Sequence, residues 1–128
     1  MSPIVRSLIL AAALAGATSA SAAPYVSGGV GEDSLATLQQ AYGNYNTHLT
    51  FAERGSGAYL AGVAVTIRDT QQQTVLATTS EGPLLYARLP AGKYTVSASS
   101  QGEVLTTTLT IPPRGHREHV FRFAPGRY

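Results

Sequence analysis

The sequence predicts an all-β protein, a seven-stranded antiparallel sandwich with one short helix near its N-terminus. Three observations predict it. Apolar residues recur at every second position from Tyr45 onward, turn residues interrupt this pattern roughly every 8–12 residues, and Thr, Val and Tyr are frequent. Hydrophobic residues make up 44% of the 128-residue chain and charged residues 12%, which excludes a disordered protein. There is no cysteine, so disulfides and thiolate metal sites are excluded as well.

The first 22 residues match the three-part pattern of a secretory signal peptide. Arg6 supplies the positive charge, residues 7–15 the apolar stretch, and Ala-Ser-Ala at 20–22 the cleavage site. We expect cleavage after Ala22 and export to the periplasm. The apolar run is about half of the roughly 20 residues that span a bilayer, so we expect no membrane insertion. No cysteine follows the cleavage site, which excludes a lipoprotein.

A leader and one helix are expected at residues 23–43, between the signal peptide and the first strand. Residues 25–31, YVSGGVG, are rich in glycine and predict an irregular leader. Leu35 and Leu38 then share a helical face with Tyr42, so we expect a helix over residues 34–42. Such a short helix is not stable alone and must pack its leucines against the sandwich.

The strands follow from alternation along the rest of the chain. In the second expected strand Val63, Val65 and Ile67 point inward, and the residues between them point outward. For the fourth, periodicity does not decide whether residues 84 and 86 or residues 85 and 87 face the core. We expect the sandwich to occupy residues 44–124 and to be followed by a tail at 125–128. Its expected strands are 47–52, 63–68, 74–79, 84–89, 94–99, 105–111 and 121–123.

Residues 79–111 carry a recognisable motif: a glycine, alternating large apolar residues, and then Leu-Pro-x-Gly-x-Tyr-x-Val. The motif positions are Gly82, Leu84, Tyr86, Leu89, Pro90, Gly92, Tyr94 and Val96. This stretch resembles the carboxypeptidase regulatory-like domain, a transthyretin-like sandwich also found in the B repeats of collagen adhesins. The resemblance implies a transthyretin-like (Ig-like) fold in a small exported bacterial protein, with Leu84 and Tyr86 as the buried pair. It implies little about function, because this fold is a general scaffold.

The sequence offers no catalytic constellation, so we expect a protein that is not an enzyme and needs no cofactor. A transthyretin-like hydrolase is a third choice, because that enzyme ends in Tyr-Arg-Gly-Ser whereas this chain ends in Phe-Ala-Pro-Gly-Arg-Tyr. The net charge is +2 without a polybasic segment, so no nucleic acid is expected as a partner.

The histidines are the weak candidates for a metal site. His116, Glu118 and His119 lie close together in sequence, and His48 is the third histidine of the chain. On a strand, residues 116 and 119 point to opposite faces, which disfavours a shared metal ion; in a loop before the last strand the geometry stays open. We expect solvated polar residues here and no bound metal.

Tyr25, Tyr42 and Tyr45 lie near one another in sequence around the helix-to-strand junction. Tyrosines are enriched at interfaces, and they equally well close the end of a small sandwich with their hydroxyls in water. We expect a non-enzymatic periplasmic interaction module whose partner is an envelope protein or glycan. The alternative is a small-ligand or metal-binding periplasmic protein. The sequence leaves the oligomeric state open.

Overall fold

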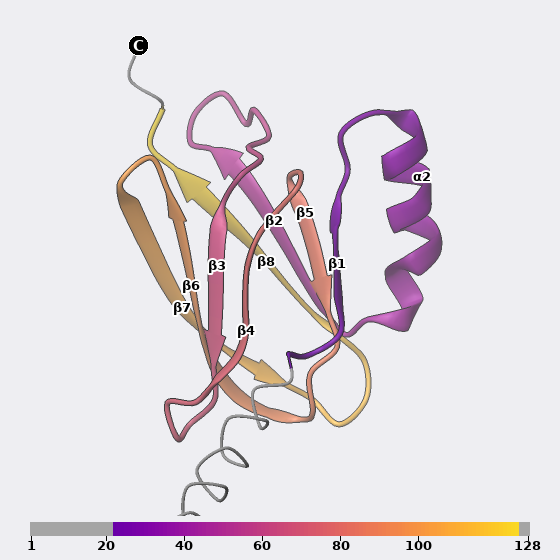
Figure 1. Cartoon of the computed structure of the whole chain (residues 1–128), viewed down its shortest axis with the longest axis vertical. Helices are drawn as coiled ribbons and strands as arrows, with labels where there is room; N and C mark the ends of the chain where they lie inside the picture. The colour runs from indigo at the N-terminus through magenta and orange to yellow at the C-terminus, as the bar shows by residue number, and fades with distance from the viewer. Residues whose placement is uncertain (1–21, 126–128) are drawn as a thin grey trace, which may run out of the picture.

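The computed structural model describes residues 22–125, which form two four-stranded sheets facing each other across one hydrophobic core (Figure 1). The expected signal peptide lies outside the described residues apart from Ala22, and the expected tail is described only at Pro125. The elements are β1 (Tyr25–Gly28), α2 (Glu32–Ala41), the 3-10 turn η1 (Tyr42–Asn44), β2 (Thr47–Glu53), β3 (Ala64–Arg68), β4 (Thr74–Thr79), β5 (Leu84–Ala87), β6 (Gly92–Ser100), β7 (Glu103–Ile111) and β8 (Arg117–Phe123).

Sheet A has the strand order β1-β5-β2-β8, and sheet B has the order β4-β3-β6-β7. Neighbouring strands are antiparallel except for β2 and β8, which run parallel. The expected all-β, sandwich-like arrangement with one short helix is therefore present. Two details of the expectation are wrong: the described residues contain eight strands rather than seven, and one strand pair is not antiparallel.

The core is built from the inward positions of both sheets, as the alternation predicts. Val65 and Ile67 of β3 are fully buried, and so is Val63, which directly precedes this strand. Phe51 and Phe121 stack from sheet A with ring centroids 5.9 Å apart. Each such side chain contributes about 1.5–3 kcal/mol by its removal from water, so packing alone can hold this cysteine-free domain.

Strand β1 corrects the expected irregular leader. Its four residues pair antiparallel with β5, and Tyr25 lies opposite Ala87. The motif glycine explains how β1 comes so close, because a Cβ atom at Gly82 would overlap the backbone carbonyl of Gly28. A glycine-rich strand of this kind has little intrinsic preference for extended structure, and pairing with a distant segment determines it.

Helix α2 begins and ends slightly before the expected positions and packs beside β1 (Figure 1). Gly31 is its N-cap, and the hydroxyl of Ser34 instead accepts a hydrogen bond from the Gly29 amide at 2.8 Å. Leu38 is buried, whereas Leu35 stays exposed. After Ala41 the chain tightens into η1, which lies against sheet A. Neither of these helical segments is long and apolar enough to span a bilayer.

The buried pair of β5 differs from the one that the resemblance implies. Leu85 and Ala87 belong to the core between the sheets, while Leu84 is half-buried. Tyr86 is also buried, but it lies on the other face of sheet A, under η1. The remaining apolar motif residues, Leu89, Tyr94 and Val96, are buried in the core.

Candidate functional site

The outer face of sheet A, turned away from sheet B, gathers polar side chains from three neighbouring strands. In the register of the sheet, His48 of β2 lies opposite Tyr86 of β5 on one side and opposite Glu118 of β8 on the other. These positions alternate with core residues such as Leu49 and Leu85, so their side chains point outward. The parallel pairing of β2 with β8 is what brings residues 48 and 118 side by side.

The turn η1 covers this row of side chains. The Tyr42 ring lies flat on the His48 imidazole, with centroids 3.8 Å apart and an interplanar angle of 6°. It meets the Tyr86 ring edge-on at 5.5 Å and the His116 ring at 5.7 Å. We call Tyr42, His48, Tyr86, His116 and Glu118 the outer-face cluster.

His48 is the buried member of the cluster, with 4% of its surface exposed. Its Nε2 lies 3.0 Å from the backbone carbonyl oxygen of Tyr42. A carbonyl oxygen only accepts hydrogen bonds, so Nε2 carries the proton. The other ring nitrogen, Nδ1, is buried without a hydrogen-bond partner. Burial lowers the pKa of His48, which keeps the ring neutral near pH 7 and leaves a lone pair on Nδ1.

His116 and Glu118 form the accessible side of the cluster. Their side chains are about half exposed, and His116 Nε2 lies 3.4 Å from Glu118 Oε2. The Tyr42 hydroxyl donates a short hydrogen bond to the same oxygen. That hydrogen bond, together with burial and the negative charge of Glu118, raises the pKa of Tyr42 to about 12.

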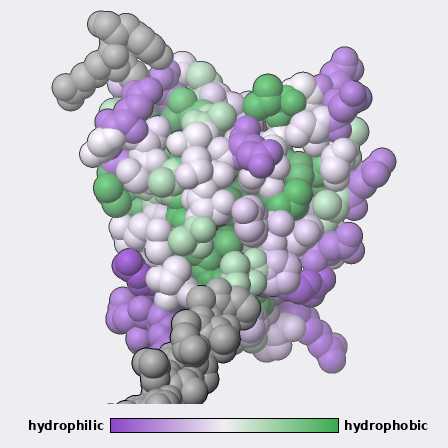
Figure 2. All heavy atoms as spheres, viewed as in Figure 1, coloured by the Kyte–Doolittle hydropathy of each residue, from purple (hydrophilic) through white to green (hydrophobic). Residues whose placement is uncertain are grey.

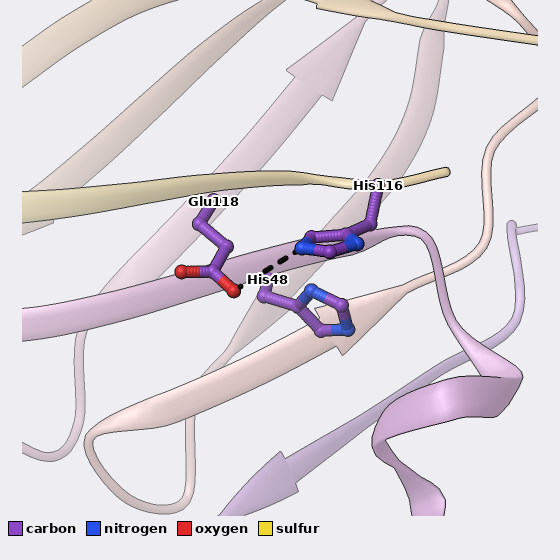
Figure 3. Close-up of side chains that lie close together, drawn as sticks. All are labelled: His48, His116 and Glu118. Carbon is purple, nitrogen blue, oxygen red and sulfur yellow. Dashed lines mark ion pairs between the residues drawn. The ribbon is translucent and has the colours of Figure 1, made fainter. Parts of the chain in front are cut away.

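His48, His116 and Glu118 together resemble a set of metal ligands. One donor atom of each lies within 4.8 Å of the other two, and no other group of three His, Asp or Glu residues in the described part of the chain meets this criterion. Figure 3 shows the His116 ring lying over His48 and the Glu118 carboxylate beside both. A nitrogen of the His48 ring is turned toward the other two side chains.

The structure brings together only part of what the sequence singled out. His116 and Glu118 lie in the cluster, but His119 points to the opposite face of β8, where its ring meets Phe121 at 4.6 Å. His48, and not His119, lies beside His116 and Glu118, although it is 68 and 70 positions away from them in the sequence. No local pattern in the sequence could show that β8 is the neighbour of β2, so the contact of His48 with this pair could not be predicted.

The three tyrosines do not form one patch. Tyr42 belongs to the outer-face cluster. Tyr25 lies on the inner face of sheet A, opposite Ala87, and its hydroxyl reaches Thr78 of sheet B at 2.9 Å. Tyr45 is half-buried at the end of η1. Tyr25 therefore links the two sheets at their edge, which is the packing role.

Among the described residues, the large hydrophobic side chains that are exposed all lie outside this cluster. The exposed large hydrophobic residues are scattered, and Figure 2 shows hydrophobic areas separated by weakly polar and hydrophilic ones on the face it displays.

A scan of protein-family models found no match to this chain, and a search of curated proteins found none either.

Proposed function

We propose that this chain is a non-enzymatic, exported binding module of the carboxypeptidase regulatory-like type, and that it binds its partner through the outer-face cluster. The observation that carries the proposal is His48: a buried imidazole with a free acceptor nitrogen, held next to two half-exposed polar side chains. A buried polar atom without a partner costs stability, and a ligand that satisfies it would remove this cost, which favours a role in binding. The N-terminal sequence pattern supports export to the periplasm, where an envelope protein or glycan would be the partner.

The turn after β5 supports the family resemblance. Pro90 and Gly92 form the connection to β6, and the Tyr94 hydroxyl donates a hydrogen bond to the Pro90 carbonyl at 2.8 Å. The Leu-Pro-x-Gly-x-Tyr pattern therefore has a physical basis in this chain: the tyrosine fixes the turn that precedes its own strand. This turn supports a transthyretin-like sandwich as the proposed fold.

The composition of the cluster supports a binding role over catalysis by an activated serine, cysteine or lysine. The outer-face cluster consists of two imidazoles, two phenols and one carboxylate. It contains no serine, cysteine or lysine that one of the histidines could activate. Glu118 is held by the Tyr42 hydroxyl and His116, so it is arranged for recognition by charge and hydrogen bonding.

Affinity capture with point variants tests the proposal. Residues 23–128 would be immobilised through the C-terminus and exposed to envelope extract from the protein's own source. Wild type would be compared with the His116→Ala/Glu118→Gln double variant and with Thr108→Ala, a control on the exposed face of β7.

We expect one reproducible ligand, retained by wild type and Thr108→Ala and lost from the double variant. Equal capture by all three proteins would place the binding surface elsewhere and contradict the proposal. Circular dichroism of each variant confirms that a loss of capture is not a loss of fold.

A further inference from the structure

The geometry of the His48 ring suits a ligand that accepts the lone pair of its Nδ1 atom. Nε2–H donates its hydrogen bond to the Tyr42 carbonyl oxygen. Nδ1 is buried and has no hydrogen-bond partner. Two kinds of ligand complement a buried lone pair: a hydrogen-bond donor and a metal cation. A histidine that donates one N–H to a backbone carbonyl while its other nitrogen is free has the arrangement found in metal-ligating histidines.

The two accessible side chains supply the remaining donors. His116 Nε2 and Glu118 Oε2 are 3.4 Å apart. In a tetrahedral zinc site with bonds of about 2.0–2.1 Å, adjacent donor atoms are separated by about 3.3 Å. These two atoms therefore already have the spacing of metal ligands. The widest separation in the set is no more than 4.8 Å, and small rotations of the half-exposed side chains would close it.

From this geometry we infer that His48 Nδ1, His116 and Glu118 bind a divalent first-row transition-metal ion, an inference that rests on the proposed binding role of the outer-face cluster. Two imidazole nitrogens and one carboxylate oxygen favour Zn²⁺ or Cu²⁺ over Ca²⁺ or Mg²⁺, which prefer sites made of oxygen ligands. Three protein ligands leave a position open on the solvent side, and an exogenous ligand can fill it.

Tyr42 acts as a positioning residue for this site. Its carbonyl fixes the His48 tautomer, its ring holds the imidazole plane, and its hydroxyl orients Glu118. Outer contacts of this kind orient metal ligands and raise their basicity. One residue of η1 therefore contacts both the buried and an accessible ligand. Metal binding replaces the direct contact between His116 and Glu118 with a shared cation.

Isothermal titration with Zn²⁺ and with Cu²⁺ tests the inference on residues 23–128. The variants are His116→Ala and Glu118→Gln, which alter half-exposed ligands and leave the core untouched. The matched control is His119→Gln, which removes the neighbouring histidine on the opposite face of β8. We expect one ion per chain, with Cu²⁺ bound more tightly than Zn²⁺. Affinity falls at least about tenfold in each ligand variant and is unchanged in the control.

Absence of saturable binding of either ion to wild type would overturn the inference. So would equal affinity in wild type and the two ligand variants, or a loss in His119→Gln as large as that in His116→Ala. These outcomes are separate from the capture experiment. If the double variant loses its captured ligand but wild type binds no metal, the binding role stands and the metal site is wrong.

Discussion

The Tyr42 backbone carbonyl accepts a hydrogen bond from His48 Nε2 at 3.0 Å, while the ring of the same tyrosine stacks on the imidazole at 3.8 Å. The chain folds back over its own strand to make both contacts, since Tyr42 and His48 are only six positions apart in the sequence. Because of this arrangement, the tautomer and plane of a buried histidine are determined by a single residue of η1. The free Nδ1 faces Glu118 and His116 as a consequence.

Stability should depend on pH through buried His48 and half-buried His119. Burial lowers the pKa of both His48 and His119. The unfolded chain, with ordinary histidine pKa values of about 6.5, then takes up protons at a higher pH than the folded chain. The free energy of unfolding is therefore highest above about pH 7 and falls as the pH drops through about 6.5 toward the lowered folded values.

Urea unfolding at several pH values checks this. His119→Gln removes one of the two groups, so its stability should fall less steeply between about pH 7 and pH 5 than that of wild type. A wild-type stability that stays level over this interval would show that neither histidine is buried in its neutral form.

Tyr42 should titrate apart from ordinary tyrosines. Its hydrogen bond to Glu118, with burial and the nearby carboxylate charge, raises its pKa to about 12 from the usual 10. Glu118→Gln removes the charge and weakens the hydrogen bond, so the pKa should fall toward 10. NMR of ring-labelled tyrosine measures both values. The same pKa in the two proteins would mean that Tyr42 and Glu118 are not in contact.

The register of β5 is testable with two neighbouring leucines. Leu85 lies in the core and Leu84 is half-buried on the other face. Leu85→Ala should lower the free energy of unfolding by about 2–5 kcal/mol, because it leaves a cavity. Leu84→Ala should cost less than about 1.5 kcal/mol, since less surface is removed from water. The reverse order, measured by chemical denaturation, would restore the pair that the family motif implies.

Local patterns predicted those parts of the fold in which one face alone is buried. Val63, Val65 and Ile67 alternate because their other face meets solvent, so period 2 identifies the core directly. The same logic fails for β5. It lies inside sheet A with the core on one side and η1 on the other, and its residues 85–87 are all buried whatever their parity.

The candidate site depends on contacts that the sequence does not encode locally. His116 and Glu118 are close in sequence, and their selection as candidates needed only that proximity. His48 joins them through the parallel pairing of β2 with β8, and Tyr42 joins through the turn that follows α2. The pairing of β2 with β8 links segments far apart in the sequence, which residue spacing along one segment cannot predict.

The most direct test of the account is the state of the His48 ring nitrogens, followed by long-range ¹H–¹⁵N NMR during a zinc titration. Without metal, we expect a neutral ring with the proton on Nε2 and an unprotonated Nδ1. On addition of Zn²⁺, the Nδ1 resonance should shift while the proton stays on Nε2, donated to Tyr42. A His48 ring protonated at Nδ1, or an Nδ1 resonance unmoved by saturating zinc, would contradict it.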